Sequence, residues 1–228
     1  MKKLLMLLLF TFSLASSASS LEDKCFDSQE EFNSSHLNFS KRTNYGLGKN
    51  IEEGLEVSTI SIEEAHQIFN LLKSKKYIPY DYKKVGCEAR AHEMVKIMDR
   101  MCLTSAKAFL VGDISYKGIR WNHHVAPILN VKDEDKIIPY IFDPSVSDTV
   151  TTLEEWTEKL KRGKLLGYYK LNITNQYIYM PEDTEIGREK YKLKDTIKTK
   201  LGLGLFKTYE TVDELPEDII HLLKKVIK

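Results

Sequence analysis

The sequence has few cysteines, little net charge and, after its first 20 residues, no long hydrophobic run. Its 228 residues contain three cysteines, and 34 lysines and arginines nearly balance 33 aspartates and glutamates. A chain this close to neutral gives no electrostatic argument for binding nucleic acid. Because a membrane span needs roughly 20 apolar residues, no segment beyond the N-terminal one is predicted to cross a membrane. The sequence also has no internal repeat and no long low-complexity tract.

Residues 1–20, MKKLLMLLLFTFSLASSASS, have the pattern of a secretory signal peptide. Two lysines precede an apolar run from Leu4 to Leu14, and small residues follow that run. A membrane anchor is the alternative, but the run is about half the roughly 20 residues that a span needs. We therefore expect cleavage after Ala18 or Ser20, secretion or delivery to the periplasm, and no stable membrane insertion afterwards.

The three cysteines are Cys25, Cys87 and Cys102. Export implies an oxidising destination, where paired cysteines tend to form disulfides. Three cysteines cannot all pair within one chain, so the odd one indicates either an intermolecular bridge or a reactive thiol.

The first half of the chain predicts an irregular segment followed by two helices. Residues 21–58 are polar and irregular, and are interpreted as a lead-in or a short pro-segment. Ser61 and Glu64 fit a capping box, and apolar residues then recur at helical spacing as far as Leu72. After a loop that contains Pro79, a second helix is expected to begin at or just after Cys87, with a methionine-rich buried stripe.

The second half of the chain predicts antiparallel strands with further helices. The period changes to two in 107–112, 123–131 and 137–143, and the polar turn VKDEDK joins the last two into a hairpin. Residues 153–160 read as a short helix, 168–173 and 176–180 as strand candidates, and 215–228 as an amphipathic helix. This order of elements predicts an α+β fold and not an alternating β–α one.

Cys87 follows Gly86 at the predicted start of the second helix. Free N–H groups and the helix dipole stabilise a thiolate at this position, and the N–H of Cys87 itself could serve an oxyanion hole. Gly86 would let the chain turn sharply and let a substrate approach closely. The alternative is a buried or disulfide-bonded structural cysteine.

A nucleophilic thiol needs a base and a group that orients the base. His123 and His124 lie on one predicted strand, and because neighbouring strand residues point to opposite faces, we expect only one to face Cys87. Alternation alone leaves open which one it is. Pairing His124 with Asp143 gives residue numbers that add up to 267, which centres the hairpin inside its polar turn. The carboxylate of Asp143 could therefore lie beside the imidazole of His124.

The remaining histidines and the cysteines do not predict a metal site. His66 has no acidic or thiol partner that the pattern places beside it, and His92 lies about 140° around the second helix from Cys87. Zinc needs three or four ligands at favourable spacing, which neither the Cys87/Cys102 spacing nor the histidine pair supplies.

Three blocks of the sequence resemble the bacterial protein-glutaminase (protein-glutamine deamidase) family: IPYDYKKVGCEARAHEM, WNHHVAPIL and IFDPSV. The resemblance covers roughly residues 60–160. It implies a papain/transglutaminase-like core, with the nucleophile helix packed on an antiparallel β-sheet. It also implies that Cys87 is the nucleophile, His124 the base and Asp143 the orienting carboxylate. Gly86 and Trp121 are then candidate substrate-binding residues.

The resemblance further implies the reaction. The substrates would be proteins or peptides with exposed glutamine, hydrolysed to glutamate and ammonia through a thioester, with no metal or organic cofactor. Apart from the resemblance, which does not cover the C-terminal part, we expect a catalytic core at 59–182, a helical extension at 183–228 packed on it, and a monomer. With Cys87 kept as a thiolate, Cys25 and Cys102 remain as a pair, and a disulfide between them is predicted.

The same triad also fits other functions. A transglutaminase passes the acyl group to an amine, and a cysteine peptidase cleaves a backbone amide, so pocket shape must separate them from a deamidase. A non-enzymatic secreted binding module would have an unreactive Cys87. Arg90 is predicted to be a helix-surface or ion-pair residue, with substrate contact as the alternative. Trp121 is predicted to shield the site or line a substrate groove, or else to be a buried aromatic residue.

Overall fold

The computed structural model describes residues 35–36, 48–52, 54–161, 169–180 and 188–210. The predicted signal peptide at 1–20 and the predicted helix at 215–228 lie outside these ranges. Among the described residues, no helix combines the length and the hydrophobicity that crossing a membrane requires.

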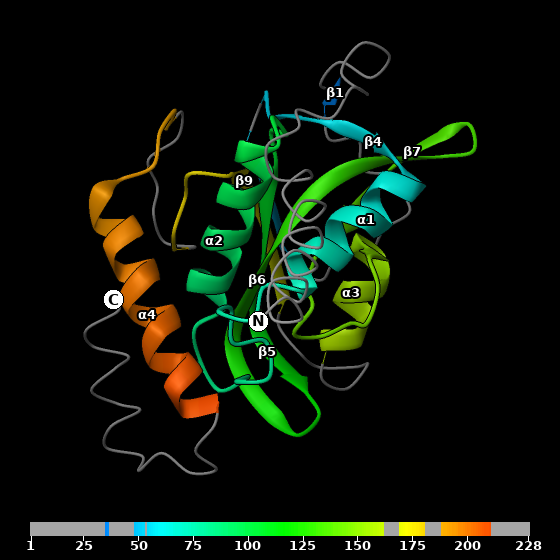
Figure 1. The fold of residues 1–228 in the computed structure, drawn as a ribbon. Coiled ribbons are helices and arrows are strands. Elements are labelled where there is room, and N and C mark those ends of the chain that lie inside the picture. Colours follow the sequence, from blue (N-terminus) through cyan, green and yellow to red (C-terminus); the bar gives the residue numbers. More distant parts are fainter. Residues whose placement is uncertain (1–34, 37–47, 53, 162–168, 181–187, 211–228) are drawn as a thin grey trace, which may run out of the picture.

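A seven-stranded sheet forms the centre of the molecule (Figure 1). Its path runs β2-β9-β5-β6-β7-β8, and β4 pairs with β6 off this path. The strands of the sheet are β2 (Gly48–Ile51), β4 (Thr59–Ser61), β5 (Ala106–Tyr116), β6 (Ile119–Asp133), β7 (Lys136–Ile141), β8 (Thr151–Thr152) and β9 (Tyr169–Asn175). All pairs are antiparallel except β2 with β9 and β4 with β6. Two short strands, β1 (Ser35–His36) and β3 (Glu56–Val57), pair separately.

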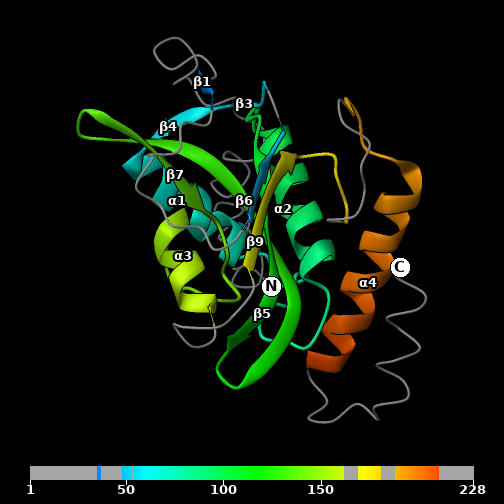
Figure 2. The ribbon, with the colours of Figure 1, turned by 180° about the vertical axis from the view of Figure 1, so that it is seen from behind.

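Two helices pack on one face of this sheet, and a third helix covers one of them from outside. Helices α1 (Ile62–Lys73) and α2 (Cys87–Arg100) lie behind the sheet in the rear view of Figure 2. Helix α4 (Leu193–Glu210) runs along the outer side of α2, which it contacts. Helix α3 (Leu153–Leu160) contacts β5, β7 and β8. The predicted mixture of helices and antiparallel strands is therefore confirmed.

The helix signals in the sequence correspond to real helix ends. Ser61 caps α1 in a capping box with Glu64, and the apolar stripe of α1 is buried from Ala65 to Leu72. Helix α2 begins at Cys87, as predicted, and buries its methionines, Met94 and Met98. Such burial of a helical stripe is the main source of helix stability in proteins.

Three parts of the fold differ from the sequence analysis. The predicted strand at 176–180 is wrong, because these residues form a turn and a bend. Strands β2 and β3 lie in a segment that was interpreted as irregular, and β2 is an edge of the main sheet. Helix α4 lies within the predicted helical extension at 183–228, but its bounds were not predicted, and its buried face is narrow, made of Asp195, Thr199, Gly202, Leu203 and Phe206.

Candidate active site

Cys87 is the first residue of α2 and follows a left-handed turn. Gly86 has φ of 89° and forms the N-cap of the helix, which only glycine does without strain. The thiol is buried, and Cys87 is the free cysteine among the described residues. A Cβ on Gly86 would lie 2.4 Å from the ring of Phe206 in α4. The space beside Gly86 is therefore occupied by Phe206, whereas the sequence analysis expected a substrate there.

Arg90 holds the loop that leads into α2. Its guanidinium is buried and donates to the carbonyl oxygens of Tyr82 at 2.8 Å, Val85 at 3.1 Å and Pro79 at 3.5 Å. These carbonyls have no strand or helix partner, and one guanidinium can satisfy several of them. Arg90 is thus a buried loop-holding residue, and the prediction of a helix-surface or ion-pair residue was wrong.

His124 and Asp143 form a buried pair. His124 Nε2 donates to Asp143 Oδ2 at 2.7 Å, and the two side chains are 2% and 4% exposed. Asp143 also accepts from Trp156 Nε1 at 2.9 Å, and its other oxygen accepts from Ser145 Oγ at 2.5 Å and Ser145 N at 3.1 Å. The carboxylate is therefore fixed from several sides and stays ionised behind the imidazole.

The hairpin register differs from the one used to place this pair. The numbers of paired residues in β6 and β7, such as Ile128 and Ile141, add up to 269 and not to 267. Asp143 follows the end of β7 and lies diagonally from His124, not directly across from it. A diagonal neighbour on the same face of a sheet is still within reach of long side chains.

The imidazole of His124 lies between two indole rings. Trp121 stacks on it with a centroid distance of 4.8 Å and an interplanar angle of 13°, and Trp156 lies 5.8 Å away on a tilted plane. Trp121 Nε1 also donates to the carbonyl oxygen of Lys83 at 2.8 Å. Trp121 is half-buried and stacks on the imidazole of His124, which agrees with the prediction that it shields the site.

The expectation that only one histidine can face Cys87 was wrong. Both His123 and His124 lie close enough to the Cys87 thiol to lower its pKa, and a ring nitrogen of His123 lies within 4.8 Å of the sulfur. His123 Nε2 also donates to Glu88 Oε1 at 2.7 Å, with side-chain exposures of 22% and 12%. The pairing of β5 with β6 shifts register between Val111 and Ile114, just before His123. The extra residue of this irregularity lies on β5, so His123 and His124 on β6 keep regular pairs with Val111 and Leu110.

The thiol and its neighbours favour a thiolate beside imidazolium groups. Burial and the Glu88 carboxylate raise the pKa of the Cys87 thiol, but hydrogen bonds from both histidines lower it, and the balance lies below its ordinary value. Burial lowers the pKa of His124, but Asp143 and the thiol raise it to about 9. The pKa of Asp143 is lowered to about 2, mainly by His124 acting against burial.

The second histidine is held charged in the same way. Burial lowers the pKa of His123, but hydrogen bonds to Cys87 and Glu88 raise it to about 11. Burial raises the pKa of Glu88, and its bonds to His123 lower it to about 2. Among the described residues, Cys87, Glu88 and His123 also offer three possible metal-ligand atoms within 4.8 Å of one another. In this structure those groups are hydrogen-bonded to each other, which pairs their charges.

The other two predicted histidines lie away from the thiol. His66 is exposed on α1, and its Nδ1 is 3.1 Å from Thr149 Oγ1. His92 is buried, its Nδ1 accepts from Lys107 Nζ at 3.0 Å, and burial lowers its pKa to about 2. Both placements agree with the interpretation that neither histidine serves Cys87.

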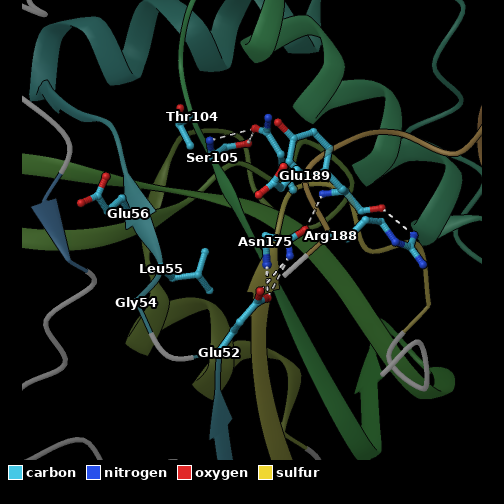
Figure 3. A pocket seen from close by; sticks show the side chains of 11 residues that line it. Glu52, Gly54, Leu55, Glu56, Thr104, Ser105, Asn175, Arg188 and Glu189 are labelled. Atoms are coloured by element: carbon cyan, nitrogen blue, oxygen red, sulfur yellow. Dashed lines mark hydrogen bonds between the residues drawn. The ribbon is translucent and has the colours of Figure 1, made fainter. Parts of the chain in front are cut away.

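A cavity of about 220 Å³ lies at the opposite end of α2 from the thiol (Figure 3). Glu52, Ser105, Asn175, Gln176 and Arg188 are among the residues that line it. Gln176 donates to Asp99, near the C-terminal end of α2, whereas Cys87 is the first residue of that helix. This cavity is therefore separate from the cluster around Cys87.

The family match and the similar solved structures all concern glutaminases. Residues 65–160 match a protein family described as glutaminase. Among solved structures, a crystal structure of protein-glutaminase is similar, with a TM-score of 0.55 and 21% identity over 65% of this chain and 88% of that chain. The family match covers 96 of the 228 residues, and the structural likeness shows a shared fold. The matched residues run from α1 to the end of α3 and contain Cys87, both neighbouring histidines and Asp143.

Two further structures of the protein-glutaminase family extend the comparison to a pro-form. A crystal structure of pro-protein-glutaminase has a TM-score of 0.55 and 18% identity over 79% of this chain and 65% of that chain. A mutant of that pro-form has the same score and 20% identity, over 76% and 64% of the two chains. These likenesses show a shared fold. No curated protein matches the chain.

Three residues of the site, Glu88, Ser145 and Trp156, were not anticipated, and His123 was the candidate base that the resemblance passed over. Glu88 and His123 complete the cluster at the thiol, and Ser145 and Trp156 hold Asp143. Ser145 belongs to the IFDPSV block, which was a usable signal. Glu88 directly follows Cys87, but only the three-dimensional pairing with His123 gives it a role. The predicted disulfide between Cys25 and Cys102 stays a prediction, because Cys25 lies outside the described residues.

Proposed function

We propose that the protein is a protein-glutamine deamidase that hydrolyses the side-chain amide of protein-bound glutamine. The observation that carries this proposal is the buried hydrogen bond between His124 and Asp143, next to a thiol that begins α2 and raises the pKa of His124. The glutaminase family match and the similarity to protein-glutaminase structures support the choice of substrate.

The first half of the reaction is acyl transfer to Cys87. The thiolate attacks the side-chain carbonyl carbon of glutamine, and a carbon–sulfur bond forms while the carbonyl oxygen takes the negative charge. Protonated His124 then gives its proton to the amide nitrogen, the carbon–nitrogen bond breaks and ammonia leaves. The products of this half are a thioester on Cys87 and a neutral His124, which Asp143 keeps in one orientation.

The second half is hydrolysis of the thioester. Neutral His124 takes a proton from water, and the resulting hydroxide attacks the thioester carbon. The carbon–sulfur bond then breaks, which releases glutamate and restores the thiolate beside protonated His124. In both halves the N–H of Cys87, at the first position of α2, is available to the developing oxyanion, and the helix dipole favours that charge.

The position of the cluster agrees with a papain/transglutaminase-like arrangement, which we also propose for the core. The nucleophile begins α2, the base lies on β6, and the carboxylate follows β7, so the three groups come from consecutive parts of one helix-on-sheet unit. The same unit could serve a transglutaminase or a cysteine peptidase. The three reactions differ in the acyl acceptor or the bond cleaved, so product analysis separates them.

Ammonia release from a glutamine-rich protein such as casein tests the proposed reaction. We expect the purified protein to release ammonia and each event to raise the substrate mass by about one unit, as an amide becomes an acid. Cys87→Ser should abolish both changes. The control, His66→Gln, alters an exposed histidine away from the thiol and should leave the rate unchanged.

The alternatives give different products in the same assay. Cross-linked casein together with ammonia would replace the proposal by a transglutaminase. Shortened casein fragments without ammonia would replace it by a peptidase. An inert protein whose Cys87 reacts no faster with iodoacetamide than a free thiol does would support the binding module.

We also propose that the chain is exported, as a monomer, and that Cys25 and Cys102 are joined. N-terminal sequencing of the exported protein should then begin after Ala18 or Ser20. Reduction should raise its mass by two hydrogens, and a Cys25→Ala variant should lack this change. Free thiols at both Cys25 and Cys102 would contradict the disulfide.

A further inference from the structure

Two imidazoles lie beside one thiol in this site and act on its pKa, although the proposed reaction needs a single proton carrier. His124 is buried, lies between Trp121 and Trp156, and is backed by Asp143. His123 reaches the same thiol and is backed by Glu88 instead. The site therefore contains two carboxylate–imidazole pairs that meet at Cys87.

The two pairs come from different parts of the fold. Asp143 belongs to the loop after β7 and approaches His124 from the side away from the thiol, within the buried core. Glu88 is the residue after Cys87 on α2. The Glu88 carboxylate, the His123 imidazole and the Cys87 thiol therefore form one compact trio, with atoms within 4.8 Å of one another.

Few other charged groups face this trio. Tyr179, which follows β9, is close enough for the charges of Glu88 and Cys87 to raise its pKa further, in addition to burial. Asp195 of α4 acts on the same tyrosine. Arg90 of α2 is bonded to loop carbonyls, and Asp143 lies behind His124. Among the described residues, His123 and His124 are thus the groups that lower the pKa of the thiol.

We propose that His123, held by Glu88, is a fixed positive charge that keeps Cys87 ionised, while His124 alone carries the proton to and from the substrate. This proposal rests on the proposed deamidase function. It assigns His123 a catalytic contact with the reacting sulfur and assigns Glu88 a positioning role. It adds two residues to the triad that the sequence resemblance implies.

The division of roles follows from what each pair must do during acylation. His124 loses its proton to the leaving ammonia, so it must release that proton readily. The pKa of His123, about 11, lies above that of His124, about 9, so His123 keeps its proton when His124 gives its own away. When the thiolate charge is consumed by the new carbon–sulfur bond, His123 and Glu88 remain as a neutral pair. The carboxylate of Asp143 keeps its charge beside neutral His124, where it is stabilised by hydrogen bonds from Ser145 and Trp156.

The pH dependence of Cys87 alkylation by iodoacetamide tests this proposal without any glutamine substrate. We expect His123→Gln to be alkylated at least about tenfold more slowly than the unmodified protein near pH 6, since losing the positive charge raises the pKa of the thiol. The difference should vanish at alkaline pH, where the thiol is ionised in both proteins. His66→Gln is the matched control and should follow the unmodified protein at every pH.

Replacing Glu88 distinguishes the proposed role from a purely structural one, because the two predict opposite changes in the alkylation rate. With His123 replaced, the carboxylate of Glu88 is left unpaired beside the thiol and raises its pKa, so Glu88→Gln added to His123→Gln should recover part of the alkylation rate near pH 6. Glu88→Gln alone should be no slower than the unmodified protein there. A purely structural pair predicts instead that the double variant is at least as impaired as His123→Gln.

Histidine NMR provides a second measurement that does not depend on the reactivity of a variant. In the protein labelled with nitrogen-15 at histidine, the resonance that His123→Gln removes should report a protonated ring at about pH 9, and Glu88→Gln should lower its titration midpoint. A neutral His123 ring at that pH, or an alkylation profile that His123→Gln does not shift, would overturn the proposal. If the alkylation pattern appears but no ammonia is released from casein, the deamidase function fails and the thiolate assignment remains.

Discussion

Asp143 is the residue on which the proposed proton carrier depends. It accepts hydrogen bonds from His124, Trp156 and both the N–H and the hydroxyl of Ser145. The Ser145 and Trp156 bonds fix the carboxylate before any substrate arrives, so the imidazole is oriented by the fold and not by the ligand. Pre-organised groups of this kind need no rearrangement during the reaction.

Replacing this carboxylate should impair the reaction far more than the fold. We expect Asp143→Asn to lower kcat by about 10³- to 10⁴-fold, because an amide neither fixes the required tautomer nor stabilises the imidazolium. Trp156→Phe keeps a ring in place and removes only the N–H, so its effect on kcat should be no more than about tenfold. Steady-state ammonia release gives both values, and a thermal melt of each variant separates inactivation from unfolding. Equal kcat losses in the two variants would contradict the orienting role.

The prediction that pairs His124 with Asp143 succeeded because residue spacing in a hairpin fixes it, whereas the prediction that only one histidine faces Cys87 failed. A hairpin centred on its polar turn brings His124 near Asp143 even though the register is two residues from the one assumed. Alternation allowed only one of the two histidines to face the thiol and the resemblance chose His124, whereas the structure places His123 beside the thiol as well. Glu88 was overlooked because its partner is that second histidine.

Helix α4 is the element that completes the site from outside the matched family region. Phe206 of α4 fills the space next to Gly86 and stacks on Tyr82 with centroids 5.4 Å apart. The turn before Cys87 is therefore packed between its own helix and α4. The position of the nucleophile depends on this contact as well as on the glycine.

The variant Gly86→Ala tests that dependence. A side chain at φ of 89° is strained, and its Cβ would clash with Phe206, so we expect a loss of stability of about 2–4 kcal/mol together with lower activity. Gly118→Ala is the matched control, because φ is 83° there but nothing lies within 4 Å of the added carbon. It should lose only about 1–2 kcal/mol, the strain alone. Urea unfolding measures both, and equal losses would mean that Phe206 yields freely.

Elements with a strong local signal were predictable and those set by distant contacts were not. Helix α3 has the predicted bounds of 153–160, and Ser61 begins α1 as its capping box indicates. Helix α4 has no clear apolar stripe: Leu193, Ile197 and Leu201 are exposed, while Gly202 is buried where the helix packs. Residues 176–180 alternate like a strand, but Gln176 instead bonds to Ser105 and Asp99.

The stability of the whole molecule should depend on pH because folding lowers the pKa of His92 and raises that of His124. His92 is kept neutral, with its pKa lowered to about 2, so stability should fall as acid protonates this histidine in the unfolded chain below about pH 6.5. His124 has its pKa raised to about 9, so its contribution is complete below about pH 6.5 and is lost as the pH rises towards 9. His123 and Cys87 largely offset each other, because the thiol proton lost on folding matches the proton that the imidazole retains.

These opposite slopes predict a stability maximum near pH 6.5. We expect the melting temperature to fall on both sides of about pH 6.5. The free energy of unfolding should change by about 1.4 kcal/mol per pH unit for each proton that the folded and unfolded states bind differently. His92→Gln, which preserves an acceptor for Lys107, should flatten the acid side between about pH 6.5 and 4. His124→Gln should flatten the alkaline side. Scanning calorimetry across this range measures both slopes, and an acid slope that His92→Gln leaves unchanged would contradict the assignment.

At the scale of the whole chain, the sequence predicted the class of fold but not the parallel pairings that complete the sheet. Change of period from helix to strand was enough to predict an α+β arrangement with an antiparallel hairpin. The parallel pairings of β2 with β9 and of β4 with β6 join segments more than 70 residues apart, and no local pattern encodes them. The lead-in that looked irregular therefore supplies part of the sheet.

The most direct measurement of the central claim, that Cys87 transfers a glutamine acyl group to water, uses water labelled with heavy oxygen. A peptide with a single glutamine is incubated in this water with the protein or with Cys87→Ser, and the product is sequenced by mass spectrometry. The account predicts one heavy oxygen in the side-chain carboxylate of the new glutamate, with ammonia released in equal amount, and neither with Cys87→Ser. An unlabelled product joined to an amine, a cleaved backbone, or a labelled glutamate that forms equally well with Cys87→Ser would contradict it.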